Sequence, residues 1–467
     1  MSETPFAATT VPADVYRNRR RALATRLSRP LAVFAGHAPA RNYASNPHEF
    51  RAGSTYLYFG GPPIEHAVLL IEPDSDGNAG CTLLRPPPGP DDALWMGEAP
   101  TDADLAATAG LEVRRIADAD ALASLLAGRE TPAVAPPCVE TIERVRTLGL
   151  APPSDDELRA IIDLRLVKDK HELAAMRRSA TVCMEAHRAA LAATRPGVRE
   201  ADVMAAFMHV LHKHECRVSF SPIITVRGEV LHACGHHNLM HEGQLLLCDA
   251  GAEEPGGYAS DITRTWPVGG TWSQMQLDLY ETVRRALDDA VEACRAGVRY
   301  RDVHDLAALR ICEGLVEVGL LRGEPTSLRE RTAHALFFPH GVGHLIGLDV
   351  HDMEDFGDLA GYAPGRSRRT EFGNRFLRLD RDLQAGMCVT IEPGIYFVPA
   401  VWRCSALVDP VKDAVNQPLV DELLAQRFGG IRIEHTICVR EAGSPEVLSA
   451  ALPTAPDELT SAQSFEG

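Results

Sequence analysis

Two aspartates occur in the stretch LLLCDAGAEEPGGYASDITRTWPV, residues 245–268, which predicts two strands joined by a turn. Asp249 ends the apolar run of the first strand, and Asp261 lies in the second. We expect a half-buried hairpin with Asp261 and Thr263 on one face and Arg264 on the other. A buried carboxylate is costly unless it is ion-paired or metal-bound, so two of them on paired strands favour metal binding. Taken singly, either aspartate could instead cap a turn or pair with Arg264.

Histidines occur in a second stretch, FFPHGVGHLIGLDVHD, residues 337–352. His340 and His344 are four residues apart, a spacing that places two ligands on one face of a helix. The glycines between them favour a loop or a strand instead. A single histidine is more often a hydrogen-bonded structural residue than a ligand. This motif, with His351 after it, therefore predicts chemistry only together with other candidates.

Glutamates end or interrupt two further apolar runs. In CVTIEPGIYF, residues 388–397, Glu392 follows a β-branched run and precedes Pro-Gly. In GGIRIEHTICV, residues 429–439, we expect Glu434 inside a strand, with Arg432 nearby. A glutamate within a strand usually faces solvent, so neither residue alone indicates a site.

Taken together, the candidates are two aspartates, a histidine and two glutamates, each in or beside an apolar strand. Four carboxylates in one site repel each other strongly, and two divalent cations would neutralise them. Two metals about 3.5–4 Å apart can share one bridging water, lower its pKa and present hydroxide to a carbonyl group. Oxygen-rich ligation with one imidazole suits Mn²⁺, Co²⁺ or Zn²⁺ better than a thiolate site would.

The elements that must position these residues begin after a separate first unit. Within residues 1–155, the segments 66–73 and 81–86 predict strands, joined by the turn DSDGNAG. Segments 102–110 and 119–128 predict short helices that end in glycine. Mixed strands and helices indicate an α/β domain.

The second unit, residues 156–467, follows the proline-containing linker LAPPSDDE. Asp169 and Glu172 have the spacing of a capping box at the start of a long helix. This helix is expected to end at RPG, residues 195–197. Its apolar face follows a 3.6-residue period through Leu173, Met176, Ala180, Cys183, His187 and Ala190.

An internal repeat follows the helix. RPGVREADV at 195–203 and RAGVRYRDV at 295–303 agree at six of nine positions. Each segment lies between two helical patterns, and strand-like segments follow both times. A period of 100 residues is too long for a solenoid, so we interpret it as two related α/β halves about a pseudo-two-fold axis. Chance similarity of two helix connections is the alternative.

Composition excludes several classes of protein. A chain of 467 residues favours two domains, and 45% apolar with 24% charged residues is typical of a globular protein. The net charge of −17 argues against nucleic acid as the main partner. We expect no signal peptide, no membrane span and no membrane partner. Eleven cysteines without CxxC spacing indicate reduced thiols and a cytoplasmic location.

These motifs together resemble the aminopeptidase P/prolidase family of dinuclear metallopeptidases. The resemblance is carried, in the family's order, by DAGAEEPGGYASDITRTWPV, HGVGHLIGLDVHD, TIEPGIYF and GIRIEHT. The segments 54–70, 85–97 and 164–180 are also similar to this family, so nearly the whole chain is covered. The resemblance implies an N-terminal mixed α/β domain followed by a catalytic domain of the "pita-bread" fold, an α+β architecture with pseudo-two-fold halves.

The resemblance also implies roles for nine residues. The metal ligands would be Asp249, Asp261, His344, Glu392 and Glu434, with Asp261 and Glu434 bridging two metal ions and Glu392 also serving as general base. His232 would lie near the Xaa-Pro unit of the substrate, and His351 would steady the scissile carbonyl. His340 and Arg432 would support the ligands from behind. The metal is expected to be Mn²⁺, with Zn²⁺ or Co²⁺ as alternatives.

The implied reaction is hydrolysis of the bond between an N-terminal residue and a following proline, by a hydroxide that bridges the two metals. Arg378 matches the position of an arginine that clamps the substrate carboxylate in prolidases, which cut only Xaa-Pro dipeptides. Long segments at 353–383 and 399–428, which we expect to rim the site, also resemble prolidase. The spacing between His232 and Asp249 favours aminopeptidase P.

Three activities therefore remain open: a Xaa-Pro aminopeptidase, a Xaa-Pro dipeptidase, and a non-catalytic pita-bread binding module. The first two would act on proline-containing peptides. The resemblance implies a homodimer or a homotetramer as the assembly.

Overall fold

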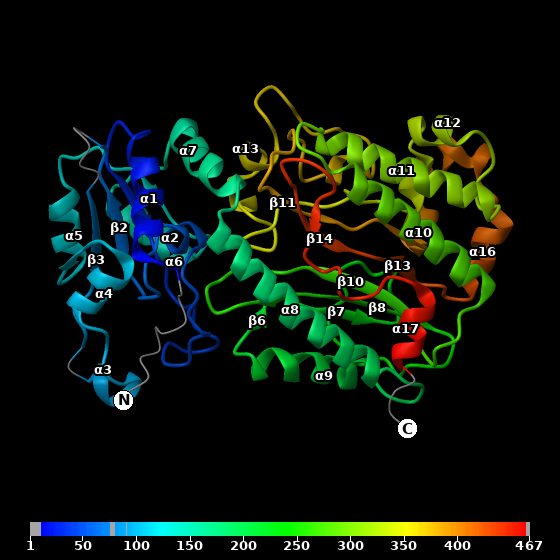
Figure 1. Cartoon of the computed structure of the whole chain (residues 1–467), viewed down its shortest axis with the longest axis horizontal. Coiled ribbons are helices and arrows are strands. Elements are labelled where there is room, and N and C mark those ends of the chain that lie inside the picture. Colours follow the sequence, from blue (N-terminus) through cyan, green and yellow to red (C-terminus); the bar gives the residue numbers. More distant parts are fainter. Residues whose placement is uncertain (1–10, 75–79, 90, 464–467) are drawn as a thin grey trace. The chain divides into compact units, whose positions relative to one another are not determined.

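The computed structural model describes residues 11–74, 80–89 and 91–463. The chain divides into two compact units, Met1–Arg165 and Leu166–Gly467 (Figure 1). The boundary suggested by the sequence, between residues 155 and 156, falls in the first turn of α7 (Asp155–Leu166). Most of the turn DSDGNAG lies outside the described residues.

The first unit is built on a mixed sheet with strand order β4-β3-β2-β1-β5. Neighbouring strands are antiparallel in β1–β2 and β2–β3 and parallel in β1–β5 and β3–β4. The two strands predicted from the sequence are confirmed as β2 and β3. The strands are β1 (Leu31–Phe34), β2 (Val68–Ile71), β3 (Cys81–Arg85), β4 (Glu112–Arg115) and β5 (Ala133–Val134).

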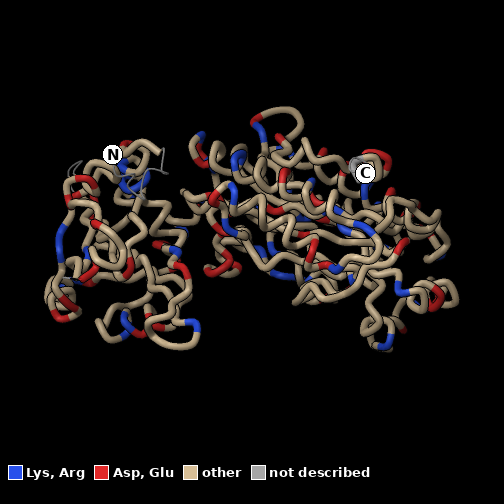
Figure 2. The backbone as a smooth tube through the Cα atoms, turned by 90° about the horizontal axis from the view of Figure 1, so that it is seen from below, with Lys and Arg blue, Asp and Glu red and all other residues tan. Residues whose placement is uncertain are grey.

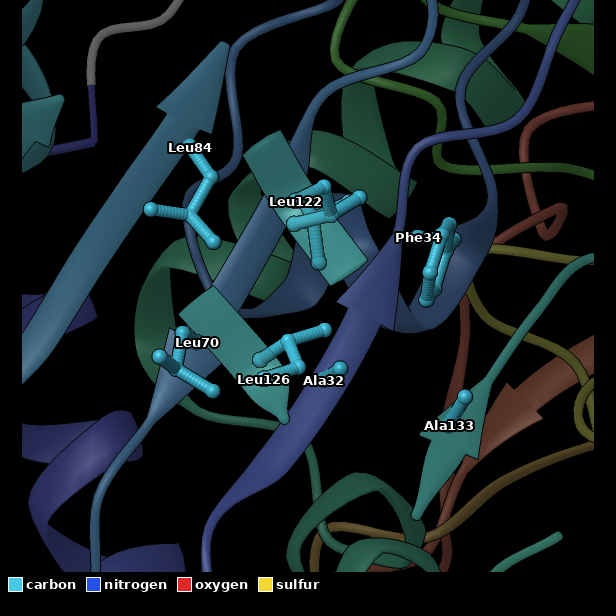
Figure 3. Close-up of a cluster of buried hydrophobic side chains, with 8 residues drawn as sticks. Ala32, Phe34, Leu70, Leu84, Leu122, Leu126 and Ala133 are labelled. Atoms are coloured by element: carbon cyan, nitrogen blue, oxygen red, sulfur yellow. The ribbon is translucent and has the colours of Figure 1, made fainter. Parts of the chain in front are cut away.

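Helices surround this sheet, and both predicted short helices are confirmed as α4 and α5. Gly110 caps α4 in the left-handed conformation, as its position in the sequence suggests. Leu122 and Leu126, four residues apart on α5, pack against Phe34 and Leu70 of the sheet (Figure 3). The helices are α1 (Ala13–Ala24), α2 (Ser54–Tyr58), α3 (Asp92–Met96), α4 (Asp102–Ala109), α5 (Ala119–Leu126), α6 (Val139–Thr147) and α7.

The second unit contains two long helix pairs and several small sheets. The sheets have the orders β10-β8-β7, β11-β14-β15, β12-β13 and β6-β9. The strands are β6 (Arg217–Val218), β7 (Ile223–Thr225), β8 (Leu245–Ala250), β9 (Ala252–Glu253), β10 (Ile262–Pro267), β11 (Cys388–Ile391), β12 (Gly394–Tyr396), β13 (Gly430–Arg432), β14 (His435–Cys438) and β15 (Glu446–Val447).

The helix pairs cover these sheets (Figure 1). Helices α8 and α9 pack on β7 and β8, and α10 packs on β11, β12 and β13. The α-helices are α8 (Lys170–Ala193), α9 (Glu200–Lys213), α10 (Gln274–Ala293), α11 (Tyr300–Glu317), α12 (Pro325–Glu330), α13 (Asp358–Gly361), α14 (Pro399–Trp402), α15 (Ser405–Val408), α16 (Gln417–Ala425) and α17 (Pro456–Gln463). Short 3₁₀ helices are η1 (Ala333–Leu336), η2 (Glu354–Phe356), η3 (Asn374–Phe376) and η4 (Asp409–Ala414).

The start and end of α8 agree with the sequence. Asp169 accepts hydrogen bonds at the first turn and Glu172 closes the capping box. The helix ends two residues before Arg195. The predicted apolar face is buried, apart from the half-buried Leu173.

The internal repeat corresponds to matching structure in the two halves. Gly197 donates to the carbonyl of Met240, and Gly297 donates to that of Leu383. Arg199 and Arg299 each form an isolated bridge with a distant strand-like residue. Both glycines have positive φ, near 85°, which explains why the repeat keeps glycine at this turn. The two copies join α8 to α9 and α10 to α11, so the pseudo-symmetric halves predicted from the sequence are present.

The predicted half-buried hairpin differs from the structure in two ways. Strands β8 and β10 are antiparallel neighbours, but every residue of both is buried. The segment between them also contains β9, which pairs with β6. Arg264 donates to the carbonyls of Leu452 and Pro453, because α17 and its preceding loop cover the outer face of β10. Alternation alone could not reveal this second cover.

Basic and acidic residues are interspersed along the backbone of each unit (Figure 2). The net charge of −17 is therefore spread over many elements. Among the described residues, we find no helix whose length and apolar character would let it cross a bilayer.

Candidate metal centre

The two aspartates lie at adjacent ends of paired strands in the second unit. Asp249 is the fifth residue of β8, and the register places it opposite Thr263 of β10. Asp261 directly precedes β10 and is not within it. Both side chains are buried and line the same cavity.

His344 reaches the aspartates from a loop that runs beside β11. The backbone of this loop pairs with the strand, since Thr390 donates to the carbonyl of His344 over 3.0 Å. Gly343 has a φ of 156°, and a Cβ there would lie 2.2 Å from the Thr390 carbonyl oxygen. The approach therefore requires glycine.

The loop orients the imidazole of His344. Nδ1 lies 3.0 Å from the carbonyl oxygen of Leu345, which can only accept, so Nδ1 carries the proton and Nε2 presents its lone pair. Nε2 is 3.5 Å from Asp261 Oδ2 and 3.6 Å from Glu392 Oε1. This tautomer leaves Nε2 available as a ligand.

The glutamates occupy two breaks between strands. Glu392 lies between β11 and β12, and Glu434 lies between β13 and β14. The expectation that Glu434 sits inside a strand is therefore wrong. Strand β13 pairs with β12 while β14 pairs with β11, so the chain changes partner strand at Glu434.

The crowded carboxylates perturb each other's protonation. Burial and then the nearby charge of Asp249 together raise the pKa of Asp261 to about 8. Burial likewise raises the pKa of Glu392 to about 7. The pKa of Glu434 is raised well above its usual value by burial and then by Asp261. These carboxylates can all be ionised at neutral pH only if additional positive charge is present.

Two buried carboxylate oxygens show where such charge would sit. Asp261 Oδ1 and Glu434 Oε1 have no hydrogen-bond partner within the described part of the chain. Ligand atoms of Asp261, His344 and Glu434 lie within 4.8 Å of one another. Carboxylate oxygens with one imidazole are a donor set for hard or borderline divalent cations. The residues present therefore fit divalent metal ions.

Side chains outside the candidate ligand set hold the carboxylates in place through hydrogen bonds. Arg432, which is buried, forms a close ion pair with Asp249 and donates to Tyr396 Oη over 2.7 Å. The Thr263 hydroxyl donates to Glu434 Oε2 over 2.7 Å. The Tyr396 hydroxyl in turn lies 2.9 Å from His340 Nε2.

The remaining histidines lie around the carboxylates. Burial lowers the pKa of His340 to about 3, so its ring is neutral, and its Nδ1 is 4.0 Å from Glu392 Oε2. The ring of His351 lies edge-on to that of His344, with centroids 4.2 Å apart. Glu354 bonds His351 Nδ1 at 2.5 Å and also forms a close ion pair with Arg378.

All ten residues that the sequence singled out line one cavity of about 710 Å³. His232, an exposed residue, contributes to it from the loop that follows β7. The rest of the lining is mostly apolar and includes Phe220, Ile223, Leu231, Phe372, Phe376, Val398 and Val401. Both segments expected to rim the site, 353–383 and 399–428, supply lining residues.

Sequence reasoning missed Tyr396 and Glu354. Tyr396 lies in the motif TIEPGIYF but looks like one more apolar strand residue, and burial of its hydroxyl among Arg432 and His340 is visible only in the fold. Glu354 is three residues after His351, a spacing that could have suggested the contact.

Each of the two units matches a known protein family. The family described as "Metallopeptidase family M24" matches residues 174–441, and "Aminopeptidase P, N-terminal domain" matches residues 16–134. A probable Xaa-Pro aminopeptidase of Fusarium vanettenii is 31% identical, over 88% of this chain and 84% of that protein. A probable Xaa-Pro aminopeptidase of Aspergillus fumigatus is 29% identical, over 88% of each chain.

Solved structures are similar over both units as well. Zn-substituted aminopeptidase P of E. coli in complex with product has a TM-score of 0.80 and 26% identity, over 97% of this chain and 98% of that one. Proline aminopeptidase P II of Yersinia pestis has a TM-score of 0.81 and 25% identity, over 98% of this chain and 100% of that one.

Proposed function

This chain belongs to metallopeptidase family M24, and we propose that it is a metal-dependent Xaa-Pro aminopeptidase. It would release the first residue of a peptide whose second residue is proline. The observation that carries the proposal is the convergence of Asp261, His344 and Glu434, with two unbonded carboxylate oxygens, in an otherwise mostly apolar cavity. Such a cavity suits a pyrrolidine ring next to a reacting carbonyl.

We assign five residues as the metal ligands: Asp249, Asp261, His344, Glu392 and Glu434. When bound, two divalent cations would lower the pKa of a water and polarise the peptide carbonyl. The oxygen-rich donor set supports Mn²⁺ as the native metal, with Zn²⁺ and Co²⁺ as alternatives. Metal analysis of the protein purified without added metal or chelator tests this assignment.

The chain's own residues would bind the substrate and move the proton. Glu392, whose Oε1 lies 3.6 Å from His344 Nε2 in the cavity lining, would accept a proton from the attacking water and return it to the leaving nitrogen. His351, whose ring Glu354 holds, would contact the scissile carbonyl. His232 would contact the Xaa-Pro unit from the exposed side of the cavity.

The surroundings of Arg378 favour an aminopeptidase over a prolidase. Arg378 lines the cavity, where a prolidase would use it to hold the free carboxylate of a dipeptide. Its guanidinium is already paired with Glu354, which also bonds His351. A substrate carboxylate would have to compete with this ion pair, so we propose that Arg378 organises the His351 side of the site.

Side-by-side hydrolysis of a Xaa-Pro-Yaa tripeptide and a Xaa-Pro dipeptide tests the proposal, using Mn²⁺-loaded and EDTA-stripped protein. We expect metal-dependent release of the first residue from the tripeptide and no cleavage of a matched Xaa-Ala-Yaa peptide. Cleavage of the dipeptide alone would refute the aminopeptidase and establish the dipeptidase. Bound metal without cleavage of either would instead establish a binding module.

We also propose a cytoplasmic location and a homodimeric or homotetrameric assembly. All eleven cysteines are free, which suits a reducing compartment. The assembly is proposed from the family resemblance, and sedimentation equilibrium of the full chain tests it.

A further inference from the structure

Two cysteines stand directly opposite each other in the sheet that leads to the candidate metal centre. Cys388 is the first residue of β11 and Cys438 is the last residue of β14, and the register pairs them. The Cys438 thiol donates a hydrogen bond to the carbonyl oxygen of Val439 over 3.8 Å. Cys388 and Cys438 each lie four residues from a glutamate of the site. Neither cysteine lines the cavity.

The hydrogen-bond pattern shows which kind of cross-strand pair this is. Val439 donates to the carbonyl of Met387, whereas the carbonyl of Cys388 accepts from Ile346 on the other side of β11. Cys388 and Cys438 therefore form a non-hydrogen-bonded pair, in which Cα atoms approach to about 4.5 Å and side chains are closest. That separation lies within the range of disulfides, roughly 4.4–6.8 Å.

The two sulfurs differ in access and surroundings. Cys388 is completely buried, whereas Cys438 is 4% exposed. The neighbouring Cys388 thiol lowers the pKa of Cys438, against its burial. Lys168 and Arg177 also act on Cys438 as neighbouring positive charges, and Glu446 opposes them. The more accessible sulfur therefore has the greater thiolate character, which is what a reactive cysteine requires.

We propose that Cys388 and Cys438 form a redox modification site. Hydrogen peroxide oxidises the two thiols, and they become a reversible intrachain disulfide. The Cys438 thiolate attacks one peroxide oxygen, the O–O bond breaks, and a sulfenic acid and one water form after protonation. The Cys388 sulfur then attacks Cys438 Sγ, the S–O bond breaks, and a second water leaves. The two sulfurs lose two electrons in total, and the peroxide is reduced to two waters. A dithiol restores both thiols by exchange.

The disulfide would link β11, which ends just before Glu392, to β14, which begins just after Glu434. It would close a loop of about 50 residues, which restricts the unfolded chain. We expect the oxidised protein to melt several degrees higher than the reduced protein. This inference does not depend on the proposed peptidase activity.

Peptide mapping of the full chain tests the site. The protein is treated with hydrogen peroxide, denatured, alkylated and digested without reductant, and the products are identified by mass spectrometry. We expect a peptide pair linked through Cys388 and Cys438, which dithiothreitol separates, before any other cysteine is oxidised. A link between other cysteines, sulfinic acid at Cys438 without a link, or two thiols that remain alkylatable would overturn the proposal.

Variants connect the link to the change in melting temperature. Cys438→Ser should abolish the increase caused by peroxide, whereas Cys404→Ser, at a partly exposed cysteine of α14–α15, should keep it. Loss of the increase in both variants, or in neither, would contradict the assignment. Because mapping uses the unsubstituted protein, the test stands even if Cys438→Ser folds poorly.

Discussion

Thr263→Val removes the hydrogen bond from Thr263 to Glu434, together with a longer one that the Thr263 hydroxyl accepts from Arg432 Nε over 3.3 Å. The Thr263 hydroxyl is completely buried and donates to Glu434 Oε2 over 2.7 Å. Valine keeps the shape of threonine and removes the donor. A hydrogen bond to a charged group contributes about 1.5–3 kcal/mol, and 1.4 kcal/mol corresponds to a tenfold change in affinity. We therefore expect metal affinity to fall by roughly 10–100-fold, the range typical of such supporting contacts.

The assay is a titration of chelator-stripped protein with buffered free Mn²⁺, followed by hydrolysis of a Xaa-Pro-Yaa peptide. The midpoint should move to higher metal concentration, while the rate at saturating metal should recover to near that of the unsubstituted protein. This separation arises because Thr263 touches Glu434 and not the substrate cavity.

Thr265→Val is the matched control. Thr265 is on the same face of the same strand, is equally buried, and donates to the backbone carbonyl of Arg432 over 2.9 Å. Both variants lose two buried hydrogen bonds, one that the hydroxyl donates and one that it accepts from Arg432, and about 2 kcal/mol of stability. Only Thr263→Val removes a bond to a carboxylate ligand. Equal midpoints for the two variants would refute the argument that Thr263 positions Glu434.

Three further predictions concern the same centre. Glu434→Gln keeps the size of the side chain but removes its charge, and it should lower bound metal below two ions per chain, as measured by elemental analysis. Tyr396→Phe should lower activity by about 10-fold or less, since it removes only the hydroxyl between Arg432 and His340; an unchanged kcat and KM would exclude that role. Metal-stripped protein should become less stable as pH rises from about 5 to 8, because the folded-state pKa values of Glu392 and Asp261, about 7 and about 8, exceed the values in the unfolded chain. The folded state then holds protons that the unfolded chain releases, so this stabilisation is present at low pH and lost as pH rises; calorimetry should find the slope in stripped protein and not in Mn²⁺-loaded protein.

Most of the site residues could be predicted because they stand in or beside apolar runs of the sequence, whereas His232 and Arg378 followed only from the family resemblance. Asp249, Glu392 and Glu434 each follow or interrupt an apolar run, and such runs form strands that converge in the core. The internal repeat then indicated that two halves would face one site. All ten candidates do line one cavity.

The supporting contacts could not be predicted in the same way, because they join residues far apart in the chain. Asp249 pairs with Arg432, 183 positions away, and not with the nearby Arg264. Arg264 instead bonds carbonyls near α17, since that segment covers the outer face of β10. Alternation along one strand assigns a face but does not reveal what covers it.

Hydrogen bonds between the two halves of the second unit hold the backbone at the ligand positions. The amide of Glu434 donates to the carbonyl of Thr263 over 3.0 Å, and the Thr436 hydroxyl donates to the carbonyl of Asp261 over 2.8 Å. Both glutamates sit where strands exchange partners, so their side chains are not confined to one face of a regular sheet. The bonds across the halves restore at these breaks the rigidity that the strand ladder would otherwise supply. The backbone positions of Asp261 and Glu434 therefore depend on both halves at once, which explains why these two ligands lie at the junction of the halves.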